Sequence, residues 1–154
     1  MIDTPIIFDA SVQNTATIHL TVPRSKMQQV MGPAIQEVLA AVTAQGASPT
    51  GPVFSYHLKL PTDTFDFEVG VPVAKAVVPA GRMKPSVLPK GRIARTIYRG
   101  AYEGLGVAWG EFNEWIEGEG LKAAPKLWEC YAVGPQAGSD PSAWQTELNR
   151  PLVE

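Results

Sequence analysis

Glu129 is the residue whose type and position most directly indicate chemistry. It lies within Leu127-Trp128-Glu129-Cys130-Tyr131, an apolar and aromatic segment typical of a β-strand. Side chains alternate along a strand, so Glu129 and Tyr131 are expected on one face and Trp128 and Cys130 on the other. If the Glu129 face lines an aromatic pocket, burial raises the pKa of Glu129, and a cationic or donor-bearing ligand relieves that cost. The alternative is an exposed glutamate paired with a lysine or arginine.

A long amphipathic helix is predicted just before this strand. Gly118 and Gly120 end it, and Pro125 prevents further helix, so the chain is expected to be extended from Lys126. Most of its apolar stripe is expected to pack on a sheet, and Trp109 is placed to serve both the core and a pocket. The stripe has the i, i+3, i+4 spacing of one helix face and consists of Leu105, Ala108, Trp109, Phe112, Trp115 and Ile116.

Composition narrows the function classes. The 154 residues carry a net charge of −2 with lysine and arginine scattered along the chain, so no basic face for nucleic acid is expected. Cys130 is the only cysteine, which rules out an intrachain disulfide and a site of several thiolates. His19 and His57 have no second ligand at metal spacing, so neither a metal nor another cofactor is expected. The sequence shows neither a leader nor a membrane span, and we expect a soluble cytoplasmic protein.

Strand and helix patterns also fill the first half of the chain. Residues 5–22 are rich in β-branched side chains and predict a strand pair or one bent strand. A helix is predicted from Ser25 to Gly46, with a kink or restart near Pro33, because proline lacks a backbone donor. Residues 53–60 and 65–71 are predicted to form two strands joined by a turn at 61–64.

The middle of the chain predicts a β-ribbon. Residues 83–87 and 92–98 both have strand character, and the segment Leu88-Pro89-Lys90-Gly91 between them has turn composition. The expected hairpin leads into the second half of the chain.

The two halves of the chain resemble each other. Residues 74 positions apart match, for example Gly46 with Gly120 and Ser55 with Glu129, and the spacing lengthens in the loop 134–139. We expect a single domain of two repeats, 1–78 and 79–154, each of the order strand-helix-strand-strand. Two such units form an α+β fold, an antiparallel sheet with both helices on one side and a ligand groove between the halves. Ser55 and His57 would then meet Glu129 and Tyr131 there.

Nearly the whole chain resembles a known family, and the second half does so most specifically. The segments Arg99-Gly100-Ala101-Tyr102-Glu103-Gly104-Leu105, Ala108-Trp109, Gly120-Leu121 and Pro125 to Tyr131 are similar to the GyrI-like small-molecule-binding domain. This is also the effector-binding domain of BmrR- and Rob-type regulators. The resemblance implies a pocket glutamate at Glu129, with Tyr131 at a matching position. Aromatic rings of such pockets hold planar or cationic compounds, and the rings expected around Glu129 are those of Tyr56, Tyr98, Tyr102, Trp109 and Tyr131.

Three functions follow from this resemblance. The first is a stand-alone small-molecule-binding protein for aromatic or cationic compounds, without a DNA-binding segment. The second is a hydrolase that opens strained electrophilic rings, with Glu129 as catalytic general base. That group has a tryptophan where this chain has Tyr98-Arg99-Gly100, and a shorter spacing than Pro125 to Glu129. The third is a protein that binds and inhibits a DNA topoisomerase.

Overall fold

The computed structural model describes residues 2–60, 62–133 and 140–153. Within these ranges, no helix is long and apolar enough to cross a membrane. Pro61 of the predicted turn and the predicted insertion at 134–139 lie outside the described residues. In chain order the principal elements are β1 (Ile6–Ala10), β2 (Gln13–Pro23), α1 (Met27–Ala44), β3 (Phe54–His57), β4 (Thr64–Pro72), β5 (Lys84–Leu88), β6 (Gly91–Arg99), the 3-10 turn η2 (Tyr102–Gly104), α2 (Leu105–Gly118), β7 (Lys122–Ala123), β8 (Leu127–Val133) and β9 (Gln145–Val153).

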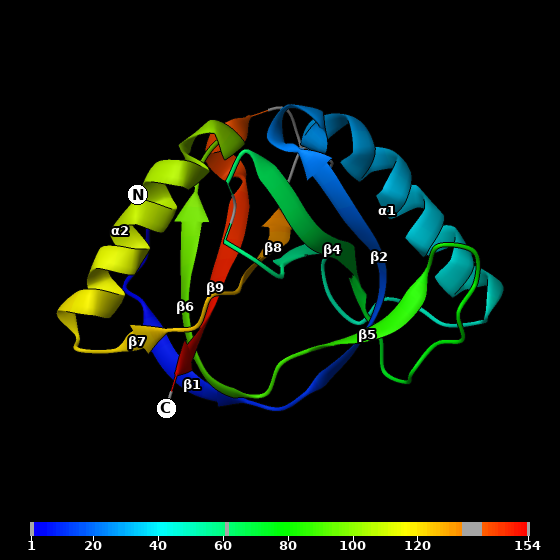
Figure 1. Cartoon of the computed structure of the whole chain (residues 1–154), viewed down its shortest axis with the longest axis horizontal. Helices are drawn as coiled ribbons and strands as arrows, with labels where there is room; N and C mark the ends of the chain where they lie inside the picture. Colours follow the sequence, from blue (N-terminus) through cyan, green and yellow to red (C-terminus); the bar gives the residue numbers. More distant parts are fainter. Residues whose placement is uncertain (1, 61, 134–139, 154) are drawn as a thin grey trace.

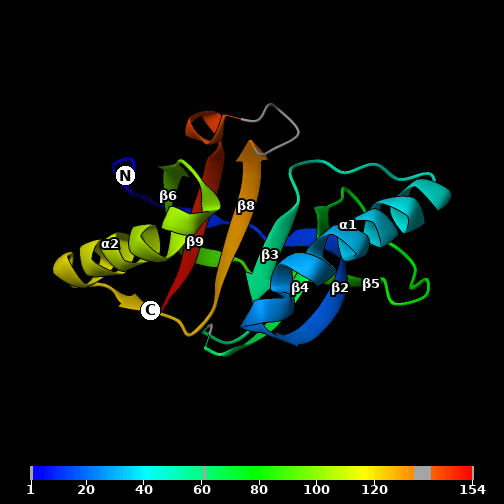
Figure 2. The ribbon, with the colours of Figure 1, turned by 90° about the horizontal axis from the view of Figure 1, so that it is seen from above.

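The fold is α+β, with a curled antiparallel sheet and two helices (Figure 1). The strand order is β1-β6-β9-β8-β3-β4-β2-β5, and β7 pairs with β9 beside this order. Both helices lie on the same side of the sheet, and β3 and β8 run between them (Figure 2). The predicted architecture of an antiparallel sheet with two helices on one side is confirmed.

The two halves contain the same order of elements. β2-α1-β3-β4 forms one half and β6-α2-β8-β9 the other, and the halves meet where β3 pairs with β8. In that pair Ser55 lies directly opposite Glu129, which is the match that the 74-residue offset indicates. The β3–β8 pairing therefore brings equivalent positions of the two halves into contact.

The predicted ribbon of 83–87 and 92–98 is wrong in its pairing. Both strands exist, but β5 pairs with β2, whereas β6 pairs with β1 and β9. In the same way β1 and β2 do not pair with each other within this sheet order. The strand that precedes the first long strand of each half thus pairs with the other half: β1 pairs with β6, and β5 pairs with β2. After this exchange β5 covers the outer edge of β2 and β1 covers the outer edge of β6.

Three apolar clusters hold the sheet and helices together. One lies under α1 and includes Ala34, Val38 and Val42, and one lies under α2 and includes Ala108, Phe112 and Ile116. The third covers the opposite face of the sheet centre and consists of Phe54, Tyr56, Leu88, Ile93 and Trp128. α1 continues through Pro33 as one helix, so the predicted restart is wrong. Burial of its apolar face offsets the backbone hydrogen bond that the proline removes.

Candidate functional site

Glu129 lies at the centre of the sheet on the face that the helices cover. Its side chain is 8% exposed. Its oxygen Oε2 accepts a hydrogen bond from Trp109 Nε1 at 2.6 Å, and Oε1 accepts one from the Tyr131 hydroxyl at 3.0 Å. Because Trp109 belongs to α2, its bond to Glu129 places the carboxyl group on the helix side. Both carboxyl oxygens therefore have a neutral donor.

The helix spacing that the sequence predicts positions Trp109. Phe112 and Ile116 face the sheet and are fully buried, and Trp109 lies one turn before Phe112, with its ring tilted against it at 5.7 Å between centroids. Trp109 itself is only partly buried. The residue thus packs at the margin of the α2 core and directs its ring nitrogen toward β8. Its predicted role in a pocket stays a prediction.

Tyr131, Ser55 and His57 extend the hydrogen bonds of Glu129 across to β3. The Tyr131 hydroxyl is 2.7 Å from Ser55 Oγ, and Ser55 Oγ is 3.5 Å from His57 Nε2. An ionised carboxylate only accepts hydrogen bonds, so Tyr131 donates to Glu129 and Ser55 donates to Tyr131. His57 Nε2 then donates to Ser55, which leaves His57 Nδ1 as the unpaired buried nitrogen. The side chains from the two halves meet as predicted.

Tyr131 is the first of three aromatic rings in successive contact. Tyr102 of η2 contacts Tyr131 edge-on at 5.8 Å between centroids, and its other side meets the Trp144 ring at 5.1 Å. Three rings thus lie in a row beyond the Tyr131 end of the Glu129 site. Trp144 was not among the predicted site residues, because it follows the loop after β8 and only the tertiary fold brings it to Tyr102.

Tyr98 packs against the η2 turn that carries Tyr102. It is buried, and its hydroxyl donates to the Ala101 carbonyl at 2.8 Å. A Cβ atom at Gly104 would lie 2.1 Å from the Tyr98 hydroxyl, and one at Gly100, where φ is 142°, would lie 2.9 Å from it. The two glycines therefore leave space for the Tyr98 ring beneath η2. Tyr98 holds the turn that carries Tyr102, and among the described residues no hydrogen bond or ring contact joins Tyr98 to Glu129.

Tyr56 lies on the opposite face of the sheet, so the predicted approach of its ring to Glu129 does not occur. It is directly across from Trp128, and the two rings meet edge-on at 5.9 Å. The physical reason is strand alternation, because a residue between Ser55 and His57 must point away from the face that those two share. Tyr56 belongs to the apolar cluster beneath the sheet.

Burial dominates the electrostatics of the site. It raises the pKa of Glu129, and the hydrogen bonds from Trp109 and Tyr131 act in the opposite direction. Burial also lowers the pKa of His57 to about 4, so that the imidazole is neutral at pH 7. Among the ion pairs of the described residues, none involves Glu129. The acid is thus desolvated and has no cationic partner among residues 2–60, 62–133 and 140–153.

Residues that could hold a metal ion are not grouped around Glu129 in the described part of the chain. The described part of the chain contains no group of three or more His, Cys, Asp or Glu side chains that could hold a metal ion. Chemically, the arrangement can accept a cation or a hydrogen-bond donor at Glu129. It can also present Glu129 as a base to a water molecule, since Tyr131 and Trp109 hold the carboxylate in one orientation.

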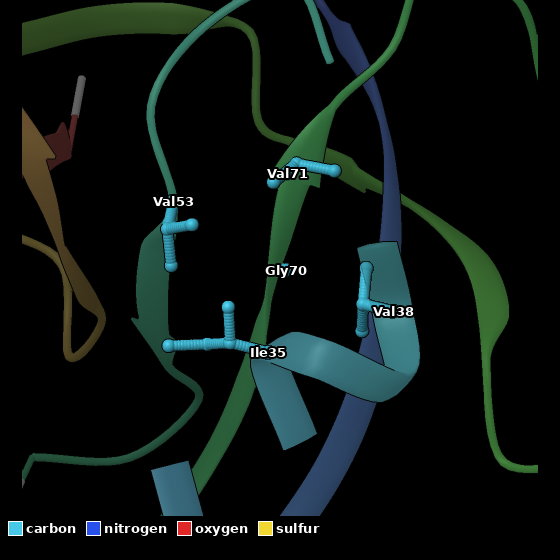
Figure 3. A pocket seen from close by; sticks show the side chains of 5 residues that line it. All are labelled: Ile35, Val38, Val53, Gly70 and Val71. Carbon is cyan, nitrogen blue, oxygen red and sulfur yellow. The ribbon is translucent and has the colours of Figure 1, made fainter. Parts of the chain in front are cut away.

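Two hollows lie away from Glu129. One is small and apolar, lies under α1, and is lined by Ile35, Val38, Val53, Gly70 and Val71, with Ile35 extending toward β3 (Figure 3). None of these five side chains is polar. The other, of about 430 Å³, lies at the C-terminal end of α1 between residues 45–48 and 73–78. Neither hollow includes a residue that the sequence predicts for the site.

The fold defines an α+β protein built from two strand-helix-strand-strand units whose central strands meet at a buried glutamate. Residues 6–152 match the model of a family described as the GyrI-like small molecule binding domain, and the chain belongs to this family. A search of curated proteins found no match.

Solved structures share this fold. The C-terminal domain of EcmrR is 19% identical with a TM-score of 0.85, and the match covers 98% of both chains. EcmrR in a complex with DNA is 23% identical with a TM-score of 0.84, and this chain spans 57% of its length. A protein from Listeria innocua described as a hydrolase is 14% identical, with a TM-score of 0.65 over 97% of this chain and 91% of that one. SAV2435 bound to tetraphenylphosphonium is 10% identical, with a TM-score of 0.63 over 98% and 94%.

Proposed function

We propose that this domain binds aromatic organic cations, with Glu129 as the counter-charge. The observation that carries the proposal is a glutamate that is 8% exposed and whose hydrogen-bond donors, within the described part of the chain, are the neutral groups of Trp109 and Tyr131. Charged side chains are rarely buried without a partner. A bound cation would supply the missing charge and would favour the ionised form of the acid.

The carboxyl group can hold a cation with or without N–H donors. A carboxylate offers about four acceptor positions, and the protein itself fills one on each oxygen. A quaternary or phosphonium cation needs none of them, since it attracts the carboxylate by charge alone. The rings of Tyr102, Tyr131 and Trp109 add cation–π attraction at the same place. The fold relative SAV2435, bound to tetraphenylphosphonium, is consistent with this ligand class.

Ligand entry requires aromatic side chains to move. Because Glu129 is nearly buried, a cation reaches it only after a displacement of Trp109, Tyr131 or Tyr102. The free energy needed to displace the Tyr102 ring is modest, because Tyr102 is partly exposed and is held by ring contacts to Tyr131 and Trp144. Binding is therefore expected to change the tryptophan fluorescence of the protein.

Titration with tetraphenylphosphonium, followed by tryptophan fluorescence and calorimetry, tests the proposal. Triphenylphosphine oxide, which carries similar rings and no net charge, is the matched control ligand. Saturable binding of the cation, at least tenfold tighter than that of the neutral compound, supports a charge-based site. Equal affinities for the two compounds would show that the Glu129 carboxylate does not contribute to binding.

Hydrolysis is the second candidate, and one observation favours it. Tyr131 and Trp109 hold the Glu129 carboxyl group in a single orientation, as a general base requires. A fold relative described as a hydrolase is consistent with such chemistry. Product formation from a cyclopropane-bearing substrate, lost in Glu129→Ala, would support it over simple binding. The third function named above, inhibition of a topoisomerase, stays a prediction.

A further inference from the structure

Arg150 is a second buried charge on the same side of the sheet. Its side chain is 7% exposed, and burial lowers its pKa. Nε donates to the Ala124 carbonyl at 3.0 Å and Nη1 donates to Asn113 Oδ1 at 2.8 Å. Neither partner is an acid, and no ion pair of the described residues involves Arg150. A guanidinium has five N–H donors, so three are left after these two bonds.

Strand register places Arg150 close to Glu129. Glu129 lies directly opposite Leu148 in the β8–β9 pair, and Arg150 follows two residues later on β9. Residues two apart on a strand share a face, and the Cα atoms of such diagonal neighbours are about 7–8 Å apart. Glu129 and Arg150 nevertheless form no ion pair with each other.

The same edge of α2 contacts both charges. Trp109 donates to Glu129, and Asn113, four residues later and one helical turn on, accepts from Arg150. The helix therefore presents an indole donor beside the acid and an amide oxygen beside the base. Trp109 and Asn113 are both neutral, so neither hydrogen bond supplies a counter-charge to Glu129 or Arg150. The α2 side of the sheet thus carries a negative and a positive pole, each desolvated.

We infer that Arg150 is the anion-binding end of the Glu129 site, so that the preferred ligands are zwitterions with an aromatic cationic part and a carboxylate. This inference rests on the proposed function, because it adds a second pole to the same ligand. A ligand carboxylate would take the guanidinium donors that Ala124 and Asn113 do not use, in the bidentate geometry that arginine favours. The cationic part would lie against Glu129.

A matched pair of dyes tests the inference. Rhodamine 110 carries a free carboxylate at neutral pH, and rhodamine 123 is its methyl ester and carries only the positive charge. Calorimetry with the intact chain should give rhodamine 110 the higher affinity by about tenfold or more, the size expected for charged hydrogen bonds. In Arg150→Gln this preference should disappear, while the affinity for rhodamine 123 stays within about threefold of the wild-type value.

Arg95→Gln is the control for overall charge. Arg95 is a partly buried arginine that pairs with Glu147 at 3.1 Å and packs on the Phe8 ring, away from Glu129. Its removal changes the net charge equally and should keep the preference for rhodamine 110. If Arg150→Gln does not fold, Arg150→Lys keeps the charge and should keep part of the preference.

The outcomes separate this inference from the proposed function. Equal binding of the two dyes by the wild-type protein would overturn the anion-binding role of Arg150 and would leave the cation site intact. An equal loss of affinity for both dyes in Arg150→Gln would also overturn it, because it would show a purely structural role. Binding of neither dye would refute the proposed function and this inference together.

Discussion

Replacement of Glu129 by glutamine is the most informative single change. Glu129→Gln removes the charge and keeps the shape of the side chain. The new amide oxygen can accept from Trp109, and its nitrogen can donate to Tyr131, whose own proton then turns to Ser55 Oγ at 2.7 Å. The hydrogen bonds of the site are thus conserved in number. We therefore expect the free energy of unfolding to change by no more than about 1 kcal/mol.

The affinity for a cation should fall much further. Two unit charges 4 Å apart attract by about 4 kcal/mol at an effective dielectric constant of 20. Part of this is offset, because burial makes ionisation of Glu129 unfavourable before the ligand arrives. A net loss of about 2–3 kcal/mol corresponds to roughly a 30- to 150-fold weaker affinity.

Calorimetric titration of tetraphenylphosphonium at pH 8 measures this loss. Glu111→Gln, which removes an exposed carboxylate from α2, is the control and should bind as the wild type does. Circular dichroism and thermal melting show whether each variant is folded. Binding by folded Glu129→Gln within threefold of the wild-type affinity would refute the electrostatic reasoning.

Three further predictions concern pH and packing. Because burial raises the pKa of Glu129, cation affinity should increase as pH rises from about 4.5 through the raised pKa and then level off. Calorimetry in buffers of different ionisation enthalpy should show proton release on binding within this range. His57, with its pKa lowered from 6.5 to about 4, should make the protein less stable as pH falls through that window, by up to roughly 3 kcal/mol. Denaturant titrations at pH 4.5 and 7 should show this slope in the wild type and its loss in His57→Phe. Gly104→Ala should destabilise the protein by about 1–3 kcal/mol, because its Cβ would lie 2.1 Å from the Tyr98 hydroxyl, whereas Gly106→Ala, with open space around it, should not.

Local patterns predict the second half of the site well. Alternation within residues 127–131 and the helical spacing that ends at Ile116 both act over a few residues, and they correctly place Glu129, Tyr131 and Trp109 on one side of the sheet. The internal repeat adds Ser55, which lies opposite Glu129 as the offset implies. The same alternation applied to Ser55 and His57 would have excluded Tyr56.

Long-range pairing could not be derived from these patterns. β5 and β6 are separated by two residues, a typical hairpin spacing, yet each pairs with a strand from the other half. A local hairpin would cover the same sheet edges, so the local pattern does not distinguish the two pairings. Arg150 has no local signal either, since only the β8–β9 register brings it near Glu129.

The location of a bound cation tests the central claim most directly. A crystal structure of the protein with tetraphenylphosphonium should place the phosphorus within about 6 Å of the Glu129 carboxyl group, with the ring of Tyr102 or Tyr131 displaced. A cation bound instead in the hollow of residues 45–48 and 73–78, with Glu129 still held by Trp109 and Tyr131, would contradict the claim.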